Sequence, residues 1–319
     1  SVFSGMESLK IFTDMNIIPN SLFKKCTGLK QITISSQVIA IDNGTFLCLQ
    51  NLVEVVLPST VTVIGSNAFS CCKSLESIEL PKSLVTIGSG AFNSCSSLNK
   101  IIFNCSELKN IEKGAFKDCI NLKNIFVPDS VTSIGSETFS GCKSLVDISI
   151  PSLKTLKNSI FCGCSSLGQM VIPSSVTSVE HHAFSNCSSL KQIVIPSTVA
   201  SVEHHAFSNC SSLKNVVLSS SITVIENGTF SNCSMLSQIE IPSSVTTIGE
   251  NAFYKCSLLR EIVIPSSVKS IGDMAFNGCE LLHHISIPSS VTSFGHNIFS
   301  DLKTLDITGD INHIPNNLF

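Results

Sequence analysis

The sequence lacks long apolar runs, clustered charges and targeting motifs, and each absence argues against a class of protein. Of the 319 residues 43% are hydrophobic, yet no apolar run approaches the ~18 residues that a transmembrane helix needs. The 20 Lys and Arg and the 23 Asp and Glu give a net charge of −3 and form no runs. Because nucleic-acid binding normally depends on a basic face, we expect no nucleic-acid partner. A signal peptide and a lipidation motif are also absent from this sequence.

Apolar residues instead occur in short packets that Pro, Ser or Gly closes. Ile193, Val194 and Ile195 form one such packet, and Pro196 follows it directly. Short apolar packets bounded by turn residues are typical of buried strands. The sequence therefore predicts a large buried interior made of many short strands, with no membrane insertion within this fragment.

Phenylalanine marks an internal repeat along almost the whole chain. The marker residues are Phe23, Phe46, Phe69, Phe92, Phe116, Phe139, Phe161, Phe184, Phe207, Phe230, Phe253, Phe276 and Phe299. Their spacing is 23 residues, apart from 24 between Phe92 and Phe116 and 22 between Phe139 and Phe161. Leu follows six positions after each marker, and Cys follows three positions after most of them. Chance does not produce such a register.

The repeating unit is A-F-x-x-C-x-x-L-x-x-I-x-I-P-x-S-V-x-x-I-x-x-x, and its L-x-x-I-x-I core matches the leucine-rich-repeat strand pattern. Alternation predicts Ile193 and Ile195 inward and Val194 outward, with Pro196 ending the strand. The V-x-x-I-G part, for example residues 245–249, predicts a second short extended segment. We expect the A-F-x-x-C-x-x-L part to form a helical turn or a short helix on the outer side.

One unit cannot bury its own apolar face, so the stack is the folding unit. We predict a leucine-rich-repeat solenoid of the β-rich α/β class, with about 13 stacked repeats of about 23 residues and a parallel sheet on the concave face. The chain is expected to be a single domain over residues 1–319. Neither end has a polar cap: Phe3 to Phe23 and Phe299 to Phe319 are short, irregular intervals. We therefore expect a fragment of a longer chain.

The unit I-P-S-S-V-T-S-V-E-H-H-A-F-S-N-C-S-S-L-K-Q-I-V, residues 172–194, resembles the BspA-like leucine-rich repeat. That family occurs in surface proteins of oral and gut bacteria and of mucosal protozoan parasites. The resemblance implies attachment to host cells, matrix proteins or other microbes. The matched positions are structural, so the resemblance carries no functional residue to this chain.

The candidate binding site is the column of residues at the middle of each predicted strand, on the concave face. It contains Thr33, Val56, Glu79, Ile102, Phe126, Ser149, Val171, Val194, Val217, Glu240, Val263 and Ser286. The seven apolar members, Val56, Ile102, Phe126, Val171, Val194, Val217 and Val263, are the predicted partner-binding residues. An exposed apolar stripe usually marks a contact surface, although β-branched residues also simply suit strands. The polar columns beside it fit an interface rim and a solvated sheet equally well.

Two His-rich segments and the Cys residues are the other sequence features with potential chemistry. Glu180-His181-His182 and Glu203-His204-His205 are 23 residues apart and supply zinc-type ligands. However, residues 173–195 and 196–218 differ at only five places, so duplication explains the repeated motif and we predict no metal site. Parallel stacking points the Cys side chains in one direction, which favours buried free thiols over disulfides.

No His and acid are placed to activate a Cys nucleophile. We accordingly predict no catalytic residue, no cofactor and no enzyme. The leading hypothesis is a cell-surface or secreted adhesin that binds a protein or glycoprotein, such as host matrix or cell surface, through the concave face. The alternative is an intracellular scaffold for protein–protein interaction, which many free cysteines favour. The sequence leaves the ligand and the oligomeric state open.

Overall fold

The structure is a computed structural model that describes residues 6–20, 22–23, 26–300, 302, 306–308 and 318. The chain divides into two compact units, Ser1–Leu153 (unit 1) and Lys154–Phe319 (unit 2). Each unit is a parallel β-solenoid, and together they contain about 13 turns with repeats about 23 residues apart. We call one turn of the solenoid a rung. The predicted single domain over residues 1–319 stays a prediction.

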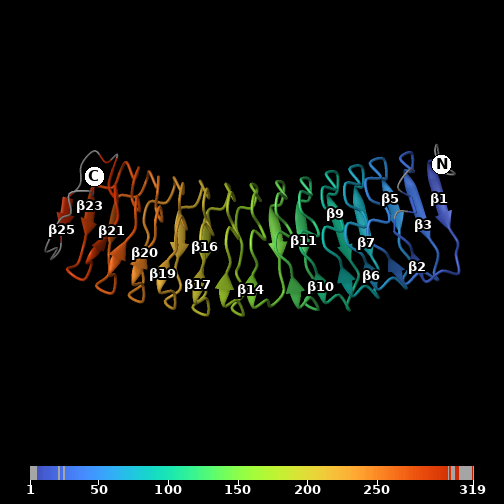
Figure 1. Cartoon of the computed structure of the whole chain (residues 1–319), viewed down its shortest axis with the longest axis horizontal. Helices are drawn as coiled ribbons and strands as arrows, with labels where there is room; N and C mark the ends of the chain where they lie inside the picture. The colour runs from blue at the N-terminus through green and yellow to red at the C-terminus, as the bar shows by residue number, and fades with distance from the viewer. Residues whose placement is uncertain are drawn as a thin grey trace. The chain divides into compact units, whose positions relative to one another are not determined.

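Most rungs contribute one longer strand of three or four residues, and these strands pair in parallel (Figure 1). In unit 1 they are β1 (Ser8–Ile11), β3 (Gln31–Ile34), β5 (Glu54–Val56), β7 (Ser77–Leu80), β9 (Lys100–Phe103), β11 (Asn124–Phe126) and β13 (Asp147–Ser149). In unit 2 they are β16 (Gln192–Val194), β18 (Asn215–Val217), β21 (Glu261–Val263), β23 (His284–Ser286) and β25 (Asp306–Thr308). The pairs β1-β3-β5, β7-β9, β11-β13, β16-β18 and β21-β23-β25 form what we call the long-strand face.

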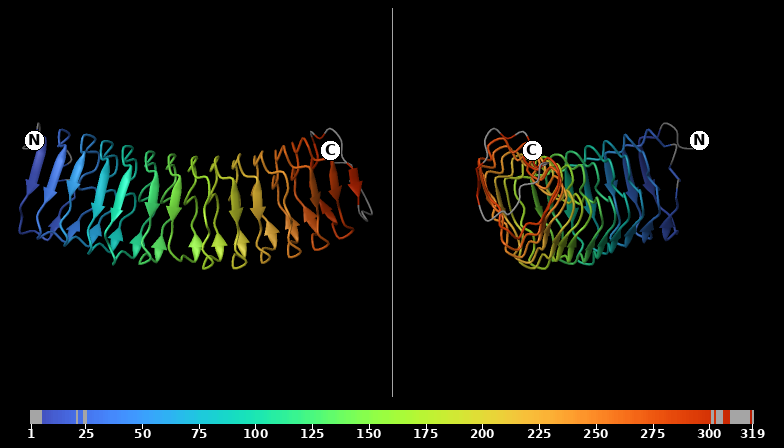
Figure 2. Two further views of the ribbon diagram at one scale, coloured as in Figure 1. Left: turned by 180° about the vertical axis from the view of Figure 1, so that it is seen from behind. Right: turned by 60° about the vertical axis from the view of Figure 1, so that its left-hand side comes forward.

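A second row of two-residue strands follows the longer ones (Figure 2). In unit 1 it contains β2 (Ile17–Ile18), β4 (Ala40–Ile41), β6 (Val63–Ile64), β8 (Thr86–Ile87), β10 (Asn110–Ile111) and β12 (Ser133–Ile134). In unit 2 it contains β14 (Thr155–Leu156), β15 (Ser178–Val179), β17 (Ser201–Val202), β19 (Val224–Ile225), β20 (Thr247–Ile248), β22 (Ser270–Ile271) and β24 (Ser293–Phe294). The predicted second extended segment within residues 245–249 is therefore confirmed as β20.

Alternation along each longer strand determines which side chains enter the core. In β16 the side chains of Ile193 and Ile195 are buried, and Val194 between them is exposed. The Ile195 amide still donates to the Val217 carbonyl at 2.9 Å. Pro196 has no amide hydrogen to continue this ladder, so the strand ends there. The predicted inward and outward positions are confirmed.

The core of each unit is a stack of Phe rings beside a column of Cys thiols. Ring centroids of successive Phe residues lie 5.0–5.9 Å apart from Phe23 to Phe139 in unit 1 and 5.2–5.9 Å apart from Phe161 to Phe299 in unit 2. Nine column thiols donate to the rung before them, as the Cys72 Sγ does to the Phe46 carbonyl at 3.2 Å. All 15 cysteines are free. The structure thus agrees with the expectation of buried thiols in this column.

The A-F-x-x-C-x-x-L segment runs as consecutive turns, and the described residues contain no helix. The expectation of a helical turn or short helix there is therefore wrong. The amides of Asn67, Phe69 and Cys71 donate to carbonyls of the next rung at 2.7–2.8 Å. The amides between them bond three residues back, as from Ala68 to the Gly65 carbonyl. Because every second amide donates its hydrogen bond to the next rung, the segment cannot form the continuous hydrogen-bond ladder of a helix.

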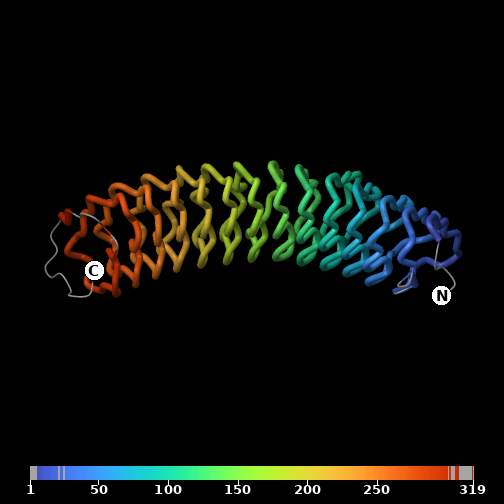
Figure 3. Tube along the Cα trace, turned by 90° about the horizontal axis from the view of Figure 1, so that it is seen from above, coloured from blue at the N-terminus to red at the C-terminus, as the bar shows by residue number. Residues whose placement is uncertain are grey.

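Two residues of most rungs adopt a left-handed backbone conformation to build these turns. They lie two positions before and two positions after the marker Phe, as Asn67 and Cys71 do around Phe69, with φ of 55° and 59°. Gly fills several of these positions, for example Gly90 and Gly141. Along the Cα trace the same bend recurs in successive rungs of each unit (Figure 3).

The sequence prediction for the ends involves Phe3 and Phe319, which lie outside the described residues.

Candidate functional site

In unit 2 the predicted binding residues form an exposed apolar stripe on the long-strand face. The side chains of Val171, Val194 and Val217 come from successive rungs and are 85%, 58% and 57% exposed. The parallel register pairs Val194 with Val217 directly. Val263 is likewise exposed, two rungs further on, after the Glu240 rung. We call these four Val residues the unit 2 stripe.

Polar side chains flank the unit 2 stripe on the same strands. Gln192 pairs with Asn215 in the register of β16 and β18, and an isolated bridge joins Gln169 to Gln192. The exposed Lys191 and Lys214 precede these amides in their rungs. The stripe is therefore bordered by amide groups and by two cations, and a bound partner could satisfy these groups by hydrogen bonds.

In unit 1 the predicted residues are separated along the face instead of forming one stripe. Phe126 is 64% exposed, Val56 is exposed and Ile102 is only half-buried. Glu79 lies in the column between Val56 and Ile102, and its carboxylate accepts a hydrogen bond from the Asn104 side chain. This part of the face therefore offers apolar and anionic groups side by side.

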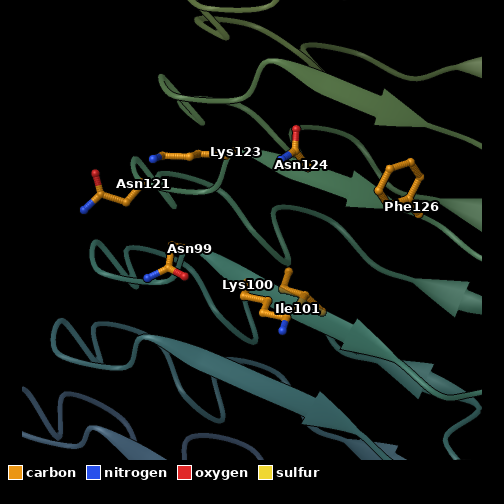
Figure 4. Close-up of a pocket in the computed structure, with 7 residues that line it drawn as sticks. All are labelled: Asn99, Lys100, Ile101, Asn121, Lys123, Asn124 and Phe126. Atoms are coloured by element: carbon orange, nitrogen blue, oxygen red, sulfur yellow. The ribbon is translucent and has the colours of Figure 1, made fainter.

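Two shallow hollows open on the long-strand face of unit 1. One, of about 590 Å³, is lined by Asn99, Lys100, Ile101, Asn121, Lys123, Asn124 and Phe126. Figure 4 shows the exposed Phe126 ring at one end of this hollow and Lys123 with Asn121 at the other. A second hollow of about 620 Å³ includes Val56, Glu79 and Ile102 in its wall. Both hollows contain residues of the predicted column.

The two His-rich segments form paired stacks on neighbouring rungs of unit 2. The rings of His181 and His204 are stacked 5.2 Å apart, and those of His182 and His205 are 5.1 Å apart. His181 Nε2 lies 2.9 Å from the Glu203 carboxylate. Burial lowers the pKa of His182, and the three neighbouring imidazoles lower it further. Within the part of the chain that the structure describes, no three His, Cys, Asp or Glu side chains form a group that could hold a metal ion.

The column thiols are expected to be unreactive because they are buried. Burial raises the pKa of Cys95 and of Cys210 to about 12, so neither carries much thiolate at neutral pH. Among the 15 cysteines only Cys48, Cys71 and Cys162 have appreciable exposure. None of them is in contact with a His–acid pair in the contacts that the described residues make.

Comparison with protein families identifies the repeat. The model for the BspA type leucine rich repeat region, which spans six copies, matches residues 3–119, 109–237 and 201–319. The chain belongs to the BspA type leucine-rich-repeat family. A comparison with curated proteins finds no match.

Solved structures with a similar fold agree with a leucine-rich-repeat assignment. A leucine-rich repeat protein from Bacteroides ovatus has a TM-score of 0.78 and 26% identity, covering 95% of this chain and 92% of that chain. A leucine rich cell surface protein from Faecalibacterium prausnitzii has a TM-score of 0.58 and 28% identity, covering 91% and 78%. The pneumococcal vaccine antigen PcpA has a TM-score of 0.61 and 21% identity, covering 100% and 82%. At that identity PcpA supports the fold alone.

The sequence interpretation of this BspA type chain missed two features of the site. Exposed Val53 and Val146 directly precede β5 and β13 and widen the apolar surface of unit 1. Both lie in a flanking column that the sequence prediction describes as polar, so the prediction does not include them. The left-handed turn positions were also missed, although recurrent Gly and Asn at two fixed distances from the marker Phe are a signal for them.

Proposed function

We propose that this chain is a non-enzymatic binding protein of the cell surface or a secreted protein, acting as an adhesin. It engages a protein or glycoprotein of a host or of another microbe through the long-strand face. The observation that carries this proposal is the unit 2 stripe, whose four Val side chains are all more than half exposed, three of them on successive rungs. Several exposed apolar side chains in one row on a soluble surface usually mark a contact site.

The stripe has the anatomy of a protein interface. Its centre is apolar, while Lys191, Lys214 and the amide side chains beside them supply a polar border. Each exposed Val contributes a modest apolar area, so affinity depends on contact with several rungs at once. Leucine-rich-repeat proteins of this type are generally non-enzymatic binding proteins, and a relative of 28% identity is described as a cell surface protein. Both facts support the proposal.

The test compares binding of the chain and of a stripe variant to immobilised matrix proteins and to host cells. The variant carries Val171→Asp, Val194→Asp and Val217→Asp, which places three charges where an interface core would be desolvated. We expect affinity to fall at least tenfold, equivalent to a loss of about 1.4 kcal/mol. Thermal melts accompany the binding curves, because three stacked carboxylates on adjacent rungs also repel one another.

A matched control carries Thr177→Asp, Ala200→Asp and Thr223→Asp. These three residues are exposed and lie on the same rungs, but beside the two-residue strands and not on the long-strand face. Its binding should equal that of the unmodified chain. Equal loss in both triple variants, or no loss in the stripe variant with an unchanged melt, contradicts a site on the long-strand face.

An intracellular protein–protein interaction scaffold is the second candidate. It is favoured by the 15 free cysteines, which suit a reducing compartment. If the chain binds neither matrix proteins nor host cells but captures a defined intracellular partner through the stripe, the scaffold replaces the adhesin as the function.

A further inference from the structure

Cys48 and Cys71 occupy equivalent positions on adjacent rungs of unit 1, outside the buried Cys column. Both lie two residues after a marker Phe and have left-handed φ values of 60° and 59°. The Cys48 amide donates to the Ser70 carbonyl at 2.8 Å, and the Cys71 amide donates to the Asn93 carbonyl at 2.7 Å. With the same backbone conformation and the same ladder, the two side chains leave the backbone on the same side of neighbouring rungs. The column thiols are buried and bonded to a carbonyl, as Cys72 is to Phe46, whereas Cys48 and Cys71 are not buried.

The distance between these two rungs suits a disulfide. Two residues earlier in each rung, the rings of Phe46 and Phe69 stack with centroids 5.0 Å apart. Disulfides join Cα atoms about 4.4–6.8 Å apart, so the rung spacing lies within this range. Burial raises the pKa of Cys48, and the two thiols are near enough for Cys71 to raise it further. Bringing the Cys48 and Cys71 sulfurs to bonding distance then requires rotation about their side-chain bonds.

The two thiols are also reachable from solution, unlike those of the column. Cys48 is exposed and Cys71 is half-buried. The adjacent Cys72 is fully buried, and its Sγ is directed to the Phe46 carbonyl at 3.2 Å. In the next rung Ser94 occupies the equivalent position. Cys48 and Cys71 are thus the accessible partners for each other in this part of the fold.

We infer that Cys48 and Cys71 are a thiol–disulfide modification site that closes a covalent clamp between two rungs of unit 1. The site takes small disulfides such as glutathione disulfide as its oxidant. The Cys48 thiolate attacks one sulfur of glutathione disulfide and releases one glutathione thiolate. The Cys71 thiolate then attacks the Cys48 sulfur of the mixed disulfide and releases the second glutathione. Two electrons pass to glutathione disulfide, and the two cysteine protons end on the two glutathione thiols.

The chemistry of the pair predicts a pH-dependent rate. Burial and the neighbouring Cys71 thiol raise the pKa of Cys48, and the cation of Lys73 partly offsets this. Exchange requires the thiolate. Closure of the clamp should therefore accelerate as pH rises towards the pKa of Cys48, and the closed form should persist after the pH is returned to neutral.

The experiment incubates the reduced full chain with glutathione disulfide, blocks remaining thiols, and maps disulfides by proteolysis and mass spectrometry. We expect a Cys48–Cys71 crosslink, a mass loss of two hydrogen atoms, and a higher melting temperature that dithiothreitol reverses. Cys48→Ser and Cys71→Ser should each prevent the crosslink and leave one glutathione on the remaining cysteine. Ser is tolerated at this backbone position, since Ser94 has φ of 59°.

The control is Cys162→Ser, which removes the other half-exposed thiol of the chain and should leave the crosslink unchanged. A chain that carries glutathione on both Cys48 and Cys71 without a crosslink overturns the inference. So does a crosslink from Cys71 to Cys72, or one between two copies of the chain. Binding to matrix proteins is measured separately, so failure of the clamp and failure of the adhesin proposal are distinguishable.

Discussion

At the scale of single residues, Phe253 shows how strongly one side chain is held. Its ring lies between those of Phe230 and Phe276, with centroids 5.6 and 5.3 Å away, and it is fully buried. Its carbonyl also accepts the Cys279 thiol at 3.1 Å. The ring therefore fills space in its own rung and contacts both adjacent rungs.

Phe253→Ala should lower the free energy of unfolding by about 3–5 kcal/mol, because truncation of a fully buried aromatic leaves a cavity. The measurement is a thermal or urea melt of the variant beside the unmodified chain. Tyr254→Ala, a change at the half-buried neighbour, should cost clearly less. Coincident melts of Phe253→Ala and the unmodified chain contradict the Phe stack as a major source of stability.

Met274 is held in a left-handed conformation that an L-residue with a long side chain rarely adopts. Its φ is 53°, its amide donates to the His296 carbonyl at 2.8 Å, and its side chain is 38% exposed. Met274→Gly removes the left-handed penalty but adds backbone entropy to the unfolded chain, so we expect a net gain of up to about 1 kcal/mol. The reverse change at an equivalent position, Gly114→Ala, where φ is 61°, should destabilise the fold. A melting temperature lowered by Met274→Gly rejects this account.

How far the sequence predicts a residue depends on what determines its conformation. Ile193, Val194 and Phe253 were placed correctly because strand alternation and the repeat register depend on local pattern alone. The turn residues Asn67 and Cys71 could not be placed in this way. Their left-handed conformation arises from amides that bond to the next rung, and a pattern search within one unit does not include that partner.

At the scale of elements, the stacked His pairs make the stability of unit 2 depend on pH. The pKa of His182 is lowered from its ordinary value of 6.5, first by burial and then by His205, His181 and His204. Below that ordinary value the unfolded chain binds more protons at this site than the folded chain does. Stability is therefore present above pH 6.5 and is lost as pH falls through the folded pKa.

We predict that the melting temperature of the chain falls between about pH 7.5 and about pH 5, and that His182→Asn makes this dependence flatter. Asn suits the left-handed backbone at this position, where φ is 55°. His283→Asn, at an exposed residue outside the stacks, should leave the dependence unchanged. An identical pH profile for His182→Asn and the unmodified chain excludes His182 as the titrating group.

The Cys column predicts a pattern of thiol reactivity. In the folded, reduced chain only Cys48, Cys71 and Cys162, three of the 15 cysteines, should react rapidly with a thiol reagent. The column thiols are protected by burial, which raises the pKa of Cys142 to about 12. Timed labelling followed by peptide mapping identifies the cysteines that react rapidly. Fast labelling of a column cysteine such as Cys210 in the native chain indicates that the rungs open.

At the scale of the whole molecule, each rung within a unit contacts its sequence neighbours, so rungs should be removable as units. Deletion of residues 196–218, which differ from residues 173–195 at five places, leaves a 23-residue interval between the flanking marker Phe residues. We expect a folded chain with a slightly lower melting temperature. Deletion of residues 196–207, about half a rung, interrupts the register and should unfold unit 2. Circular dichroism and thermal melts distinguish the two. If both deletions lower the melting temperature equally, the rungs are not independent units.

The division into two units was not predicted, although the sequence contains a signal near it. The boundary between Leu153 and Lys154 lies in the interval from Phe139 to Phe161, which has 22 residues and not 23. A repeat that is one residue shorter changes the path of the chain between two strands. The sequence pattern alone, however, does not tell whether the neighbouring rungs remain in contact at that point. The concave curvature of the sheet likewise stays a prediction, because curvature arises from small rotations summed over many rungs.

The ladder that joins each rung to the next by short backbone hydrogen bonds, such as that from Phe69 to Ala91 at 2.7 Å, also determines the response to a pulling force. A load applied to the two ends of one unit breaks the bonds of an outer rung first, since the inner rungs of that unit remain paired on both sides. A detached rung of about 23 residues extends to about 80 Å of backbone, whereas a stacked rung occupies only about 5 Å of the axis. A solenoid that tethers a cell in a flowing fluid would therefore lengthen stepwise and limit the tension on its bound partner.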